Sequence, residues 1–157
     1  MGLSIRVYNN LKIADKNQDN SFEIYVIDES WKNKVKNFEY GKSYTGDLIN
    51  DSLSYPYYSH NRFREALIRL IQREDLLDAE GRIKWNELPS DLPFIDLIDF
   101  ADNEGCLDYE VAKNLFEDFE QWKLDAEKYL SEYELEIYKK WKQICKDASN
   151  NGVIVFW

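Results

Sequence analysis

Two segments near the start of the chain alternate apolar and polar residues. Residues 3–7 read LSIRV and residues 22–26 read FEIYV, with a polar loop at residues 15–20 between them. A period of two is typical of strands that bury one face. We therefore predict two strands that pair with each other as a hairpin.

The region that follows has a weaker pattern. Residues 28–37 indicate a helical turn, and residues 40–46 indicate a short strand between two glycines. Residues 47–59 place Pro56 among tyrosines and serines, which is typical of a loop. The aromatic density of this segment indicates that it packs against the rest of the protein.

Helical periodicity begins near residue 60. Apolar residues fall on one helix face at Phe63, Leu67, Leu70 and Ile71. We predict that Ser59 or Asn61 caps this helix, because either side-chain oxygen can accept an N–H of the first turn. The helix is expected to end near Glu74.

Residues 95–119 organise the rest of the chain. An apolar run leads into a polar turn at residues 102–105, and a long helical pattern starts at Asp108. Ser131 and Glu134 have the spacing of a capping box, so we predict that a second helix begins there at once. A joint this short predicts antiparallel neighbours or a bent pair.

The chain ends in an almost wholly apolar run, residues 153–157, after Gly152. Such a run requires burial on both faces, so we predict a central strand beside the N-terminal one. The predicted class is α+β, in one domain over residues 1–157. A small, mostly antiparallel sheet containing both chain termini packs against a capped helix (about 60–74) and a C-terminal helical pair (about 108–148).

Composition narrows the functional classes. The content is 44% hydrophobic and 32% charged, as in globular proteins, and 15% aromatic residues predict an aromatic core. A net charge of −10 argues against binding to nucleic acid or to an anionic membrane surface. With no apolar run long enough to span a membrane and only two distant cysteines, we expect a cytoplasmic protein with reduced thiols.

Two turns share the pattern D-x-E-G, at residues 78–81 and 102–105. This pattern forms the centre of a calcium-binding loop, where carboxylates at alternate positions reach inward. Leu76 and Phe100 stand where the first ligand carboxylate belongs, and Val111 stands at the last ligand position of the second loop. Ordinary acidic turns are therefore favoured over calcium sites, and we predict no metal and no cofactor.

His60 is the only histidine, so a Ser- or Cys-based nucleophilic site has one available imidazole base. Two interpretations of its surroundings remain open. In the first, Asp102 and Glu104 form a buried ion pair with Arg62 or Arg64 that fixes the turn to the helix. In the second, a ligand-binding polar pocket is lined by Ser59, His60, Arg64, Asp102 and Glu104.

Acidic residues dominate the predicted helical pair. Ten acids face three lysines between Asp108 and Ile137. This face is either a solvated surface or a docking surface for a basic protein partner. The candidate partner-binding residues are Glu117, Glu120, Glu127 and Glu134.

Three segments resemble an uncharacterised family of small bacterial and phage-borne proteins: residues 57–67 (YYSHNRFREAL), 93–105 (PFIDLIDFADNEG) and 151–156 (NGVIVF). Members often have Cys at the position of Asn103 and His at the position of Trp157. These differences argue against an essential thiol in the turn or an essential histidine at the end. The resemblance implies no activity, because none is assigned to the family.

These observations predict a non-catalytic, cytoplasmic, acidic interaction protein of the immunity or phage-accessory kind, which binds a basic protein partner. The alternative is a small-ligand binder or an enzyme. It would use the polar pocket between the turn at residues 102–105 and the helix start at residues 59–64.

Overall fold

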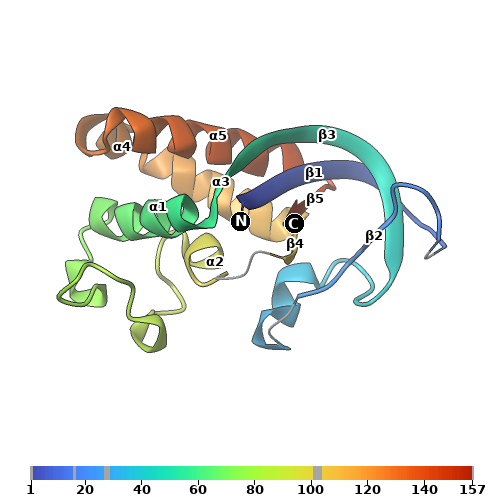
Figure 1. The fold of residues 1–157 in the computed structure, drawn as a ribbon, viewed down its shortest axis with the longest axis horizontal. Coiled ribbons are helices and arrows are strands. Elements are labelled where there is room, and N and C mark those ends of the chain that lie inside the picture. Colours follow the sequence, from blue (N-terminus) through green and yellow to red (C-terminus); the bar gives the residue numbers. More distant parts are fainter. Residues whose placement is uncertain (1, 16, 27–28, 101–103, 157) are drawn as a thin grey trace.

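The computed structural model describes residues 2–15, 17–26, 29–100 and 104–156. These residues form an antiparallel sheet in the order β2-β3-β1-β5-β4 (Figure 1). The strands are β1 (Gly2–Ile13), β2 (Phe22–Glu23), β3 (Ser43–Pro56), β4 (Gly105–Asp108) and β5 (Val153–Phe156). The predicted α+β class, with the N-terminal and C-terminal strands in one antiparallel sheet, is confirmed.

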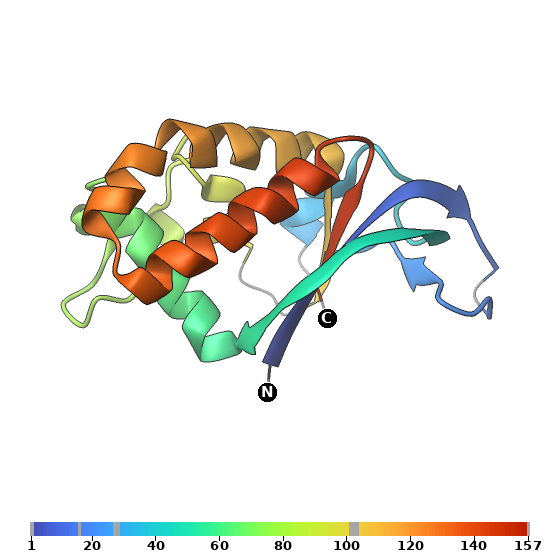
Figure 2. The same cartoon turned by 90° about the horizontal axis from the view of Figure 1, so that it is seen from above.

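Helices cover the sheet on one side. The α-helices are α1 (Tyr57–Leu70), α2 (Ile95–Ile98), α3 (Tyr109–Gln121), α4 (Lys123–Tyr129) and α5 (Glu132–Ala148). Short 3-10 helices are η1 (Glu29–Val35), η2 (Glu74–Leu76) and η3 (Trp85–Glu87). α5 packs on β1, β3 and β5, and α3 lies beside α5 (Figure 2).

The core between the sheet and the helices is rich in aromatic side chains, as predicted. The rings of Phe94 and Phe119 are 4.8 Å apart and meet edge to face, and those of Phe119 and Tyr138 do the same. Trp141 and Phe156 are fully buried beside them. Edge-to-face contacts of this kind stabilise the core beyond the area they bury.

The sheet curls until its two edges approach each other. On one side of the segment after β2, Ile24 N donates to Lys42 O at 2.9 Å, and on the other side Cys106 N in β4 donates to Tyr25 O at 2.9 Å. Gly105 makes this approach possible. Its φ is +127°, and a Cβ there would lie 3.0 Å from Phe100 Cζ and 3.3 Å from Tyr25 O.

Two predictions about the sheet are wrong. β3 lies between β1 and β2, so the first two strands do not form a hairpin, and residues 47–56 are strand rather than loop. The reason is irregular pairing. The β1–β3 register shifts three times, between Ile5 and Val7, Val7 and Tyr8, and Asn9 and Lys12. Each bulge interrupts the alternation by which a strand is recognised in a sequence.

The predicted neighbourhood of the N- and C-terminal strands is confirmed. β5 pairs with β1, with Ile5 opposite Phe156 and Tyr8 opposite Val153. On its other side β5 pairs with β4, so it is central, and all four of its residues are buried. Trp157, included in the predicted strand, lies outside the described residues.

The predicted helix ends are partly correct. The capping box is present, with Glu134 N donating to Ser131 Oγ and Ser131 N donating to Glu134 Oε1. The first helix begins earlier than predicted, at Tyr57, and has no side-chain cap. Ser59 and Asn61 do not cap it, because both lie inside the helix, where Asn61 Oδ1 accepts from Arg64.

Candidate functional site

Among the described residues, the members of the predicted pocket lie in different places. His60 and Arg64 are buried, whereas Ser59 lines a hollow on the outer side of α1. Glu104 accepts a hydrogen bond from the hydroxyl of Tyr25 at 3.0 Å. Asp102 lies outside the described residues. The described members of the predicted set are therefore divided between the inside of α1, its outside and the edge of the sheet.

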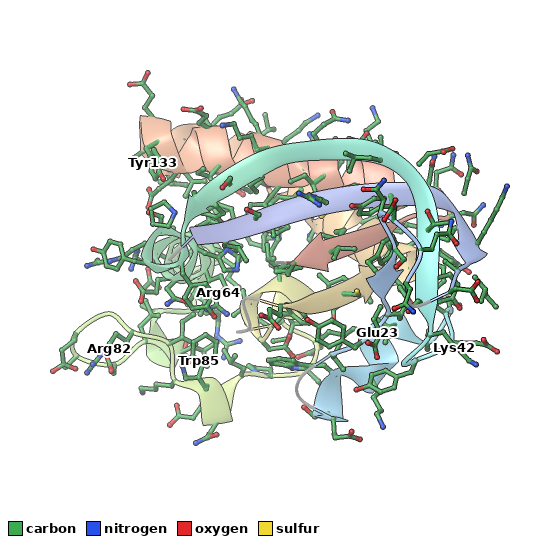
Figure 3. All side chains as sticks on the ribbon, turned by 45° about the vertical axis from the view of Figure 1, so that its right-hand side comes forward. Glu23, Lys42, Arg64, Arg82, Trp85 and Tyr133 are labelled. Carbon is green, nitrogen blue, oxygen red and sulfur yellow. The ribbon has the colours of Figure 1, made fainter. Side chains whose placement is uncertain are left out.

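Arg64 holds the chain before the turn through backbone atoms. Its guanidinium donates to Ile98 O at 3.0 Å and to Phe100 O at 3.3 Å, and it lies 4.8 Å from the centre of the Trp85 ring (Figure 3). Burial lowers the pKa of Arg64. The described residues show no ion pair between Arg64 and Glu104. Arg64 therefore connects α1 to this segment through the carbonyls of Ile98 and Phe100, and the predicted pairing with Asp102 lies outside the described residues.

Arg62, the other predicted cation, lies on the outer face of α1. Its guanidinium is 5.0 Å from the centre of the Tyr58 ring. It therefore faces solvent and the outer hollow rather than the turn that follows Phe100.

His60 belongs to a buried hydrogen-bond chain. Trp141 Nε1 in α5 donates to the hydroxyl of Tyr55 in β3 at 3.0 Å, and that hydroxyl is hydrogen-bonded to His60 Nδ1. Burial, with Arg64 as a smaller contribution, holds the pKa of His60 well below 6.5. A neutral imidazole sealed in the core is a structural group at neutral pH, and it does not reach a ligand.

A second buried cation was not predicted. Lys34 Nζ lies 2.7 Å from Asp96 Oδ1 and 2.9 Å from Asp99 Oδ1, although the second contact is poorly aligned for a hydrogen bond. Burial raises the pKa of Asp99, and Lys34 opposes that rise. The spacing of two aspartates three residues apart in a helix was a usable signal, because it places both carboxylates on one face.

The first D-x-E-G turn is held by its own atoms. Asp78 Oδ1 accepts from Glu80 N at 3.0 Å and from Arg82 N at 2.9 Å. Over the described part of the chain, no three His, Cys, Asp or Glu side chains are placed to hold a metal ion. Cys106 and Cys145 are buried as free thiols, and burial raises the pKa of Cys106 to about 12.

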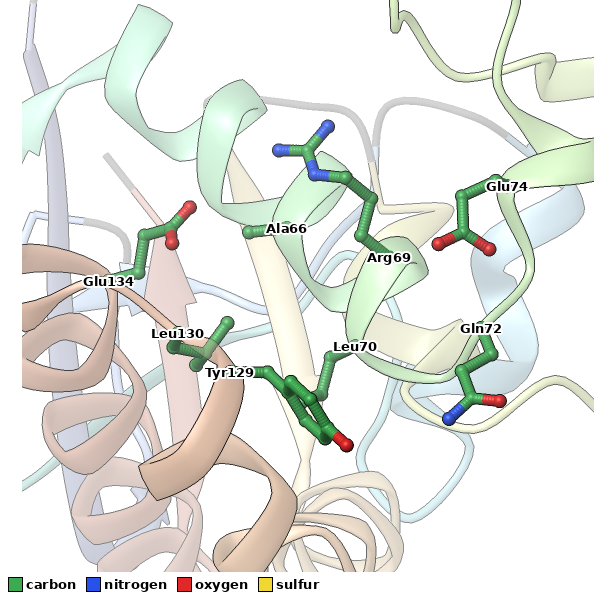
Figure 4. A pocket seen from close by; sticks show the side chains of 8 residues that line it. All are labelled: Ala66, Arg69, Leu70, Gln72, Glu74, Tyr129, Leu130 and Glu134. Carbon is green, nitrogen blue, oxygen red and sulfur yellow. The ribbon is translucent and has the colours of Figure 1, made fainter.

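Two adjoining concave surfaces lie along the outer face of α1. Two hollows, of about 320 and 470 Å³, meet at Glu134 and separate α1 from the joint between α4 and α5. Figure 4 shows the first hollow, with Ala66, Arg69 and Leu70 of α1 facing Tyr129 and Leu130. We call the two hollows together the tyrosine groove.

The tyrosine groove has an apolar floor and an aromatic rim. Phe63, Ala66, Leu70 and Ile137 are buried beneath it. Three tyrosines on its rim are well exposed: Tyr58 at 64%, Tyr129 at 60% and Tyr133 at 55%. The capping box at Ser131 turns the chain sharply, and this turn places Tyr129 and Tyr133 on either side of Glu134.

The sequence did not predict the tyrosine groove, but two of its residues were already candidates for binding a ligand or a partner. Ser59 came from the predicted pocket and Glu134 from the predicted acidic face. Two tyrosines four residues apart around a capping box were the available signal. The missing information was the position of α1 opposite that joint, which depends on the tertiary packing.

The acidic helical face is less uniform than predicted. Glu120 pairs with Lys142 at 2.6 Å and with Lys123 at 3.5 Å, and Glu134 is used in the capping box. Glu117 and Glu127 are exposed, and the described residues provide neither with an ion-pair partner. Lys139, Lys142 and Lys146 of α5 line a hollow with Phe116 and Glu120 of α3. Counting charges only up to Ile137 therefore exaggerated the imbalance.

Comparison of the chain with family models, with curated proteins and with solved structures gives no match. The family resemblance noted from the sequence therefore stays a prediction. A search of the helices in the described residues finds none with the length and apolar content needed to cross a membrane.

Proposed function

We propose that the protein is a non-catalytic binding protein whose tyrosine groove holds a short segment of a basic protein partner. The observation that carries this proposal is the set of three exposed tyrosines above an apolar floor. Tyrosine provides a large rigid contact area at low entropic cost and is enriched at protein interfaces. Apolar side chains of the segment would enter the two hollows as anchors.

The charge of the protein supports a basic partner. The net charge of −10 attracts cationic proteins and disfavours nucleic acid. Glu134 lies between the two hollows of the groove, whereas Glu127 lines a separate hollow with Lys123, Lys139 and Lys142. Arg62 and Arg69 line the opposite wall, so the segment is expected to carry an acidic residue among its basic ones.

The alternative function, a small-ligand site or an enzyme, has less support. Its predicted residues His60 and Arg64 are buried under α1, and Glu104 is hydrogen-bonded at the sheet edge. The cytoplasmic location and the immunity or phage-accessory role are kept as part of the proposal, on the basis of composition and family resemblance.

The proposal is tested by peptide display on the immobilised full chain, followed by fluorescence anisotropy with the selected peptides. We expect the peptides to be basic and to carry apolar anchors. The double variant Tyr58→Ala/Tyr133→Ala should bind them about 30-fold more weakly, as for loss of an interface hot spot. Ile13→Ala is the control, because Ile13 is equally exposed but lies on β1.

The contribution of charge is tested with Glu117→Gln and Glu127→Gln, since Glu120 and Glu134 have structural partners. Both substitutions should slow association at low salt, because each reduces the negative charge that attracts a cationic partner. Selected peptides that bind the double tyrosine variant as tightly as the unaltered protein would overturn the proposal. So would NMR shifts that map to the β1–β3 pair instead of the groove.

A further inference from the structure

The hydrogen-bond chain at His60 suits a neutral imidazole. Trp141 Nε1 can only donate, so the Tyr55 hydroxyl oxygen accepts from it, and His60 Nδ1 is the acceptor within reach of the hydroxyl proton. Burial lowers the pKa of His60 and so favours the neutral form, and with Nδ1 as the acceptor its proton lies on Nε2. Among the described residues, Nε2 has no hydrogen-bond partner.

Protonation of His60 conflicts with this arrangement. An imidazolium donates at both nitrogens, so its Nδ1–H would point at the Tyr55 oxygen and the hydroxyl proton would lose its acceptor. The rings that face the imidazole are Tyr55 from β3, Tyr57 from α1, Trp141 from α5 and Phe156 from β5. Arg64 of α1 is the charged group that acts on it, and its charge has the same sign.

His60 lies in the first turn of α1. That turn has no capping side chain, and a hollow of about 470 Å³ lies on its outer side. Tyr58, Ser59 and Arg62, which line this hollow, lie within two residues of His60. Movement of the turn would therefore change one end of the tyrosine groove.

We propose that protonation of His60 releases the first turn of α1 from β3 and α5, and that acid thereby removes the Tyr58 end of the tyrosine groove. Only the effect on the groove rests on the proposed function; the release itself does not. In the released turn His60 has the ordinary pKa of a histidine, whereas in the packed turn burial holds its pKa well below that value. The equilibrium for release therefore shifts by up to tenfold for each pH unit below 6.5.

The test is an NMR titration of the full chain from pH 7.5 to pH 4.5, which follows the His60 imidazole together with the backbone amides. We expect the native peaks of Tyr58, Ser59 and Arg62 to disappear as the imidazole becomes protonated. The amides of Leu115 and Phe119 in α3 should keep their native positions. Because the chain has one histidine, the imidazole signal is unambiguous.

The pKa values of Asp99 and Asp118 are also raised, so their titration can overlap that of His60. The variant His60→Asn distinguishes an acid step due to the histidine from one due to these carboxylates. The amide oxygen replaces Nδ1 as an acceptor for Tyr55 but cannot be protonated in this range. We expect the acid step at α1 to vanish in this variant. If His60→Asn does not fold, the titration of the unaltered protein decides.

Three results would overturn the proposal. In the first, the imidazole becomes protonated while the peaks of α1 stay native. In the second, the peaks of α1 and α3 disappear together. In the third, the acid step at α1 persists in His60→Asn. A groove-binding peptide, tested separately, should lose affinity in acid with the unaltered protein but not with His60→Asn. If no peptide binds the groove at any pH, the proposed function fails, whereas the NMR result on α1 stands.

Discussion

Two cations are buried in the described part of the protein, Lys34 in η1 and Arg64 in α1, and they are stabilised in different ways. Lys34 lies between the carboxylates of Asp96 in α2 and of Asp99, the residue that follows α2. Arg64 lies against two carbonyls at the end of the same helix and an indole ring. The compact ammonium is compensated by charge, and the planar guanidinium by directed hydrogen bonds and stacking.

This difference shows how α2 is held. It is a single turn of helix, too short to be stable by itself. Lys34 of η1 binds the carboxylates of Asp96 and Asp99. Arg64 of α1 binds the carbonyls of Ile98 and Phe100, at and just after the C-terminal end of α2. The comparison predicts that a variant at Lys34 can be rescued by removing negative charge, whereas a variant at Arg64 cannot.

The largest effect is expected for Lys34→Met. Removing one member of a buried ion pair leaves uncompensated charge, and we expect a loss of about 3 kcal/mol in the free energy of unfolding. Breaking a fully buried ion pair costs about 3–5 kcal/mol. We expect the lower value because the side chains of Asp96 and Asp99 are 26% and 33% exposed. Urea unfolding at pH 7 measures the loss. Lys32→Met is the control, because Lys32 is an exposed cation of the same 3-10 helix.

The rescue sharpens this comparison. Adding Asp96→Asn and Asp99→Asn to Lys34→Met removes the unpaired charges and should restore more than half of the lost stability. A triple variant no more stable than Lys34→Met would show that the ammonium acts by packing instead of by charge.

Arg64→Met is expected to cost about 2 kcal/mol, because the carbonyls of Ile98 and Phe100 lose their donors inside the protein. The relief of a buried charge offsets part of the loss. Arg62→Met, on the exposed face of the same helix, should change stability by less than about 0.5 kcal/mol. Arg64→Lys should recover little, and a lysine variant as stable as the original protein would contradict the role given to the guanidinium plane.

The smallest effect is expected for Trp85→Leu, a loss of about 1 kcal/mol, because the indole is half-exposed and contributes one cation–π contact. A double-mutant cycle with Arg64→Met isolates that contact, and the two losses should add up to more than the loss of the double variant. If the two losses instead add up to the loss of the double variant, the indole ring and the guanidinium have no interaction energy.

The sequence predicted the parts of the fold whose signals are local. Ser131 and Glu134 form their capping box within one turn, and the apolar residues of β5 specify burial whatever their neighbours are. Residues 47–56 of β3 were predicted as a loop because bulges opposite β1 break their alternation. The contact between Lys34 and Asp96 joins segments far apart in sequence, and no local pattern identifies which pairs will meet. The tyrosine groove depends on the distance between two helices, which is decided by core packing beneath them.

The central position of β5 also constrains how the protein is made. β1 and β4 are joined through β5, because residues 153–156 pair with both of them. During synthesis on the ribosome, β1 and β3 can pair early, but the sheet stays incomplete while the 96 residues from Tyr57 to Gly152 are added. The nascent chain therefore presents an open β1 edge until residues 153–156 have emerged. Cooperative folding is expected only after β5 has left the exit tunnel.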